Sequence, residues 1–100
     1  MNYFKLSSAQ QKVVLLMFTE DYYMVNNEGR DFKVWLEDKS LTKRGTLNRN
    51  TGEYLHREGW VSPAVNVGRV SSRLFYDVLS EKAIKHLQYL VSVGKLNPYK

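Results

Sequence analysis

The stretch 60–94 constrains the fold more than any other part of the chain. Its first residues form an extended segment in which Pro63 favours the edge of a sheet, because proline cannot donate a ladder hydrogen bond. A polar, glycine-centred turn follows at 66–72, and residues 73–78 alternate as in a strand with one buried face. Ser80 can then cap a helix. This order predicts a β-hairpin that leads into a C-terminal helix.

A second helix is predicted near the N-terminus, over residues 8–22. Ser7 and Ser8 are good N-caps, and Gln10 or Gln11 can complete a capping box. The following run at 13–18 is apolar on most sides, which is typical of a helix packed by several neighbours.

The stretch 32–39 fits two structures. Phe32, Trp35 and Leu36 have helical spacing, and Asp31 can cap a helix there, whereas Phe32, Val34 and Leu36 also alternate as in a strand. The cap favours a short helix.

A basic helix is predicted over residues 42–58, with Ser40 or Thr42 as its cap and Gly59 as its stop. Its apolar stripe contains Leu47, Thr51, Tyr54 and Leu55. The opposite face includes Gly45, Gly52, Arg49, Glu53 and His56. Glycines on that face either permit close approach of something bulky or mark a break in the helix, since glycine costs about 1 kcal/mol inside one.

Composition points to one soluble domain spanning residues 1–100. There is no cysteine, which excludes disulfides and thiolate sites and is compatible with a reducing compartment. No apolar run approaches the roughly 18 residues of a membrane span, and the N-terminal residues have no pattern of a secretion signal. We expect a cytoplasmic protein that does not contact a membrane.

The net charge of +5 is distributed unevenly. Residues 1–38 carry four positive and six negative side chains, and residues 39–100 carry eleven positive and four negative ones. A net charge of +7 on the second segment, beside −2 on the first, favours a polyanionic partner such as nucleic acid.

Two segments resemble the winged helix-turn-helix family. "LTKRGTLNRNTGEYLHREGWV" is similar to that family's second helix of the turn motif and its exit into the wing, and "RLFYDVLSEKAIKHL" to its second wing strand and following helix. The resemblance covers residues 8–92, strongest over 41–90, and is to multiple-antibiotic-resistance-regulator-like and PadR-like repressors. It implies an α+β, mostly helical fold with a C-terminal β-hairpin wing followed by a helix. The segment 19–39 departs from the family, since it has little alanine and leucine.

The resemblance also implies a DNA-binding site. The helix 42–58 would enter the major groove, with Arg49 bonding guanine and Asn48 or Asn50 bonding adenine. The wing 66–73 would bring Arg69 and Arg73 to the backbone or the minor groove. The complete set of expected DNA contacts is Thr42, Lys43, Arg44, Thr46, Asn48, Arg49, Asn50, Arg69 and Arg73.

Catalysis is not expected. The two histidines, His56 and His86, lie on different predicted helices, and no metal-binding or phosphate-loop motif occurs. We expect neither an enzyme nor a cofactor.

Two functions remain open. The first is a sequence-specific, double-stranded DNA-binding transcriptional regulator, acting as a homodimer through its terminal helices. The aromatics that could form the interface, or equally the core, are Tyr3, Phe4, Tyr22, Tyr23 and Tyr89. The second is a winged-helix adaptor, possibly encoded by a phage or mobile element, whose acidic first third contacts a host protein complex.

Overall fold

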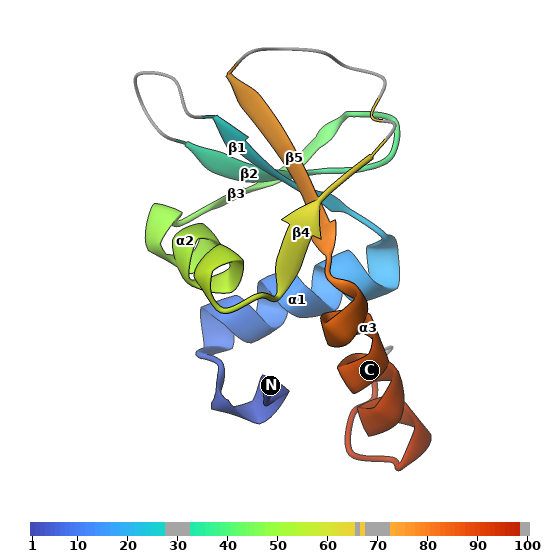
Figure 1. The fold of residues 1–100 in the computed structure, drawn as a ribbon. Coiled ribbons are helices and arrows are strands. Elements are labelled where there is room, and N and C mark those ends of the chain that lie inside the picture. The colour runs from blue at the N-terminus through green and yellow to red at the C-terminus, as the bar shows by residue number, and fades with distance from the viewer. Residues whose placement is uncertain (28–32, 66, 68–72, 99–100) are drawn as a thin grey trace.

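The computed structural model of the protein describes residues 1–27, 33–65, 67 and 73–98. Within these residues, three α-helices and five strands follow one another in the order α1, β1, β2, β3, α2, β4, β5 and α3 (Figure 1). A short 3-10 helix, Tyr3–Lys5, precedes them. The bounds are α1 Ser8–Glu20, β1 Tyr23–Asn27, β2 Val34–Glu37, β3 Lys43–Leu47, α2 Arg49–Arg57, β4 Val61–Pro63, β5 Leu74–Leu79 and α3 Glu81–Ser92.

The strands form one antiparallel sheet in the order β3-β2-β1-β5-β4. β1 is the middle strand, so its residue Asn26 lies directly opposite Val34 of β2 and Phe75 of β5. β4, which contains Pro63, is an edge strand, as the missing N–H of proline predicts. α1, α2 and α3 lie on the same side of the sheet (Figure 1).

The hydrophobic core lies between this face of the sheet and the helices. Met24 of β1, Leu36 of β2 and Leu79 of β5 project into it and are at most 6% exposed. Alternation along the strands places these side chains on the face that the helices cover. The helices contribute the side chains Val13, Val14, Met17, Leu55, Ala83, Leu87 and Leu90.

The opposite face of the sheet carries a smaller cluster around a buried carboxylate. Glu37 is 2% exposed and accepts hydrogen bonds from Trp35 Nε1 at 2.6 Å and from the Tyr76 hydroxyl at 3.1 Å. Tyr23 packs edge-on against Tyr76, and Lys39 Nζ lies 3.7 Å from the centre of the Tyr23 ring. A buried carboxyl group needs such partners, because burying a polar group without hydrogen bonds costs several kcal/mol.

Several expectations from the sequence are confirmed. Ser7 caps α1 in a complete capping box with Gln10, and Ser80 caps α3 by accepting from the N–H of Ala83. Gly59 follows α2 with a φ of +78°, a conformation that glycine adopts without strain. β4 and β5 form the predicted hairpin, whose tip lies largely outside the described residues.

The expected fold class is wrong. The described chain is not mostly helical, and its five-stranded sheet and element order are not those of a winged helix-turn-helix domain with a C-terminal wing. The preferred short helix at 32–39 is instead strand β2, because Val34 and Leu36 alternate into the core and pair with β1.

The helix expected over 42–58 is also corrected. Its first part is strand β3, which pairs with β2, and the helix begins only at Arg49, capped by Asn48. No helix in the described part of the chain combines the length and the apolar character that crossing a bilayer requires.

Candidate binding groove beside helix α2

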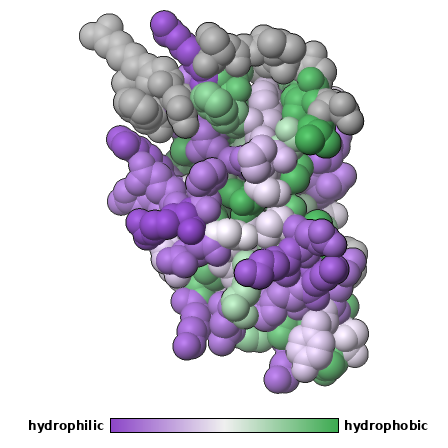
Figure 2. Space-filling view, in the orientation of Figure 1, coloured by the Kyte–Doolittle hydropathy of each residue, from purple (hydrophilic) through white to green (hydrophobic). Residues whose placement is uncertain are grey.

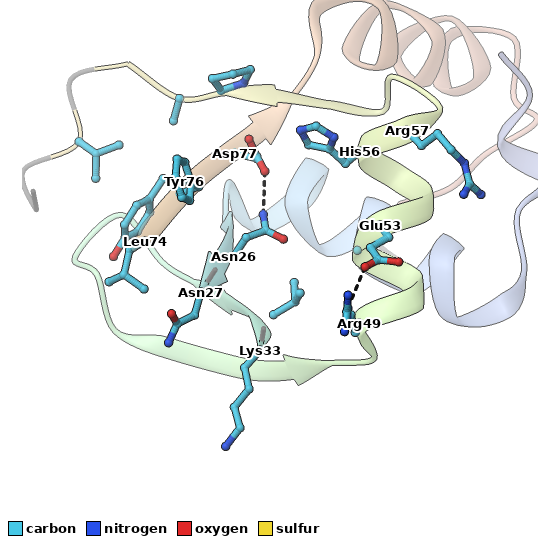
Figure 3. Close-up of a pocket in the computed structure, with 16 residues that line it drawn as sticks. Asn26, Asn27, Lys33, Arg49, Glu53, His56, Arg57, Leu74, Tyr76 and Asp77 are labelled. Atoms are coloured by element: carbon cyan, nitrogen blue, oxygen red, sulfur yellow. Dashed lines mark hydrogen bonds and ion pairs between the residues drawn. The ribbon is translucent and has the colours of Figure 1, made fainter. Parts of the chain in front are cut away.

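A groove opens between α2 and the end of the sheet face that the helices leave uncovered (Figure 3). Its volume is about 670 Å³, within the range of sites that hold small ligands. α2 forms one wall, and β1, β2, β4 and β5 form the rest. We call it the α2 groove; its central lining residues are Asn26, Val34, Gly52, Glu53, His56, Phe75 and Asp77.

The floor of the α2 groove is polar. Asn26 Nδ2 donates a hydrogen bond of 2.9 Å to Asp77 Oδ2, which joins β1 to β5 across the sheet. Asp77 is only 4% exposed. Both side chains lie between α2 and the strands, and His56 extends from α2 above them (Figure 3). A buried carboxylate and an amide therefore face the groove where the core residues end.

Gly52 sets how closely α2 approaches the sheet. It is buried, and a Cβ atom at this position would lie 3.0 Å from Cγ1 of Val34 on β2. Only glycine allows this separation without displacement of a neighbour. The close approach predicted for this glycine is therefore to β2 within the chain itself, and it places one wall of the groove.

The outer face of α2 carries a polar stripe. Arg49, Asn50, Glu53 and Arg57 are exposed, and Arg49 Nε pairs with Glu53 Oε1 at 2.8 Å. Their helical spacing places the four on one side, opposite the buried Leu55. Figure 2 shows hydrophilic side chains over the region of α2. The stripe offers donors of the kind that bind phosphates and base edges.

Most acidic side chains of the first third do not form an open acidic surface. Among the described ones, Glu37 is buried, Asp38 pairs with Arg44 at 2.8 Å, and Asp21 lies 3.5 Å from Lys39. The backbone N–H of Thr42 and the Arg44 guanidinium hold the pKa of Asp38 below its ordinary value. Both pairings join an acidic residue of the first segment to a cation of the second, so the acidic side chains are partly neutralised within the chain.

The structure divides the predicted DNA contacts into two groups. Asn48, Arg49 and Asn50 come together at the N-terminal end of α2. The other group lies on or beside the edge strand β3: Thr42, Lys43, Arg44 and Thr46.

Two members of the β3 group already have partners within the chain. Arg44 is bound to Asp38, and Lys43 Nζ lies 5.6 Å from the centre of the Trp35 ring. Arg73 is exposed immediately before β5, and Arg69 lies outside the described residues.

Sequence reasoning missed Asn26, Phe75 and Asp77. No pattern in the sequence marked the stretch around Asn26 as a strand, and the alternation of residues 73–78 puts Phe75 and Asp77 on one face without showing which face is buried. Only Phe75 is exposed, at 47%, whereas Asp77 is buried. An aspartate between aromatic and aliphatic residues of a strand is the one local signal for such a site.

None of the family models, curated proteins or solved structures compared with the chain matches it. Within the described residues no group of three or more histidine, cysteine, aspartate or glutamate side chains could hold a metal ion.

Proposed function

We propose that the protein binds double-stranded DNA through the polar stripe of α2, as a regulator that places this helix in the major groove. The observation that carries the proposal is the exposed stripe that includes Arg49, Asn50 and Arg57, on a chain with a net charge of +5. Arginine can bond guanine through two donors, and asparagine can bond adenine similarly. A major groove about 12 Å wide admits an α-helix.

Two arginines on one helix suit the two tasks of DNA binding. Arg49 is at the first turn of α2, and Arg57 ends the helix two turns later. One can contact a base edge while the other holds a phosphate, which positions the helix without specifying sequence. Lys33, whose ammonium group points away from the groove, adds a further cation near the end of the sheet (Figure 3).

The adaptor alternative has less support. It relied on an acidic contact surface in the first third, and the described acidic residues there are largely buried or paired within the chain. Protein binding remains the outcome that we expect if DNA binding fails.

The test compares two charge reversals with matched local effects. Arg49→Glu and Lys85→Glu each lower the net charge by two, and each removes an exposed ion pair of i, i+4 spacing. Binding to a labelled pool of random duplexes is measured by fluorescence anisotropy at 50 and 200 mM salt. We expect wild type to lose affinity about 40-fold between the two, for about three phosphate contacts.

Comparing the two variants shows whether DNA affinity depends on the position of the lost charge or only on the net charge of the protein. Arg49→Glu is expected to weaken binding more than about tenfold, and Lys85→Glu, on α3, to weaken it only slightly. Equal losses of DNA affinity in both variants would show that α2 is not the contact surface. If wild type binds no duplex pool, protein binding is the function that we expect instead.

A homodimer stays a prediction of the same proposal. Phe4 and Tyr89 are 51% and 57% exposed, as an aromatic interface requires before assembly. Tyr3, in contrast, is buried within the chain. Light scattering on the purified protein gives the mass directly, and a monomer at all concentrations would contradict the prediction.

A further inference from the structure

We propose that the α2 groove binds an unpaired guanine base from the nucleic acid that α2 contacts. The inference rests on the proposed function and specifies what the groove adds to it. The α2 stripe is the proposed contact with duplex DNA, and it assigns no role to the groove of about 670 Å³ beside the helix, whose floor is polar.

The hydrogen-bonding groups of the floor favour guanine. A carboxylate has about four acceptor positions, so Asp77 can accept from a ligand as well as from its partners within the chain, of which Asn26 is one. The Watson–Crick edge of guanine presents two adjacent donors, N1–H and N2–H. The other bases place an acceptor beside their donors on this edge, which would face the carboxylate unfavourably. Unpaired bases are commonly recognised by hydrogen bonds on this edge.

Phe75 supplies a surface on which the base can stack. It lies directly opposite Asn26 in the sheet, lines the groove, and is 47% exposed. A large aromatic side chain exposed on the rim of a polar groove is a common platform for single-stranded bases. Val34 and Gly52 complete an apolar wall on the far side of the groove floor.

The rim can hold the backbone of the same nucleotide. Arg49, in the first turn of α2, lines the groove and supplies its cationic rim. Because Arg49 also belongs to the α2 stripe, a strand bound along the stripe passes the mouth of the groove. An unpaired base in that strand can therefore enter while its phosphate stays on the cationic rim.

The experiment measures binding to three otherwise identical duplexes: one fully paired, one with a single bulged guanine, and one with a bulged adenine. Wild type is expected to bind the guanine bulge about tenfold more tightly than either of the others. Phe75→Ala should abolish the preference for the guanine bulge over the fully paired duplex, because stacking on an aromatic ring contributes a factor of that size for any base. Val65→Ala removes an exposed apolar side chain that follows β4 and does not line the groove, and it should preserve the preference.

A second variant tests the hydrogen bonds. Asp77→Asn replaces an acceptor by a donor and should reduce the guanine preference even where Phe75 is intact, with circular dichroism confirming the fold. If wild type binds all three duplexes equally, or if Phe75→Ala keeps the preference, the groove assignment is overturned while the proposed function stands. If no duplex binds at all, both are overturned.

Discussion

The helix-facing side of the sheet has two halves that differ in chemistry although the same strands form both. In the covered half, Met24 of β1 and Leu79 of β5 point into the core and are buried. In the uncovered half, towards the other end of the strands, two residues after Met24 in β1 and two residues before Leu79 in β5, Asn26 and Asp77 form the floor of the α2 groove. The helix-facing side chains therefore change from apolar to polar towards this end of the strands.

The polar floor of the groove comes from residues of the strands themselves. An uncovered sheet face could have been closed by larger apolar side chains or by a longer α2. Instead the strands carry an amide–carboxylate pair and an exposed Phe75 at this place. Apolar area contributes about 25 cal/mol per Å² when it is buried, so exposing Phe75 forgoes stability. We infer that the covered half serves stability and the uncovered half serves binding.

The largest expected effect is a loss of stability when a side chain of the covered half is removed. Leu36→Ala, in the covered half, removes a side chain that is 2% exposed and should lower the free energy of unfolding by about 2–5 kcal/mol. Phe75→Ala, in the uncovered half, should cost less than about 1 kcal/mol while it weakens binding. Urea denaturation gives both values, and a similar loss of stability in the two variants would break the comparison.

A smaller loss of stability is expected at the contact between α2 and β2. Gly52→Ala adds a methyl group about 3.0 Å from Val34, and the overpacking should cost about 1–3 kcal/mol, partly offset by the better helix propensity of alanine. Val34→Ala in the same chain makes room for that methyl group. In a double-mutant cycle the two changes should couple favourably by more than about 0.5 kcal/mol. Additive costs would mean that α2 does not rest on Val34.

The smallest expected effect is the change of stability with pH that His86 of α3 causes. Burial, followed by the charge of the Met1 amino group, lowers the pKa of His86 below its ordinary value of 6.5. His86 Nε2 accepts a hydrogen bond of 3.1 Å from the Tyr3 N–H, which requires the neutral ring. Because the folded pKa is lower than the unfolded one, stability from this group is present above pH 6.5 and is lost as the pH falls through the folded pKa.

His86→Gln keeps an acceptor for the Tyr3 N–H but does not titrate. The urea midpoint of this variant should therefore fall less between pH 7.5 and pH 5 than that of wild type. Equal falls would show that protonation of His86 does not act on the fold.

The hairpin, α1 and α3 could be predicted from the sequence because their signals are local. Ser7, Pro63, Gly59 and Ser80 each act on residues within a few positions of themselves. The sheet could not be predicted in the same way. β3 is a polar edge strand with no apolar alternation, so only its pairing with β2 defines it.

The candidate site was only half predictable for a related reason. The exposed residues at the start of α2 follow from their helical, polar pattern around Arg49. The groove depends on Asn26 and Asp77, which are 51 positions apart in the chain and meet only through the pairing of β1 with β5. Gly52 raised doubt about a helix because glycine lowers helix propensity, yet packing against Val34 requires it.

The most direct test of the account is to map where a duplex touches the protein, from amide chemical shifts in a titration at low salt. We predict that the shifts concentrate on α2, from Asn48 to Arg57, and on the adjoining groove strands around Asn26 and Asp77. Shifts concentrated on α3, or on the opposite sheet face around Tyr23 and Trp35, would contradict it.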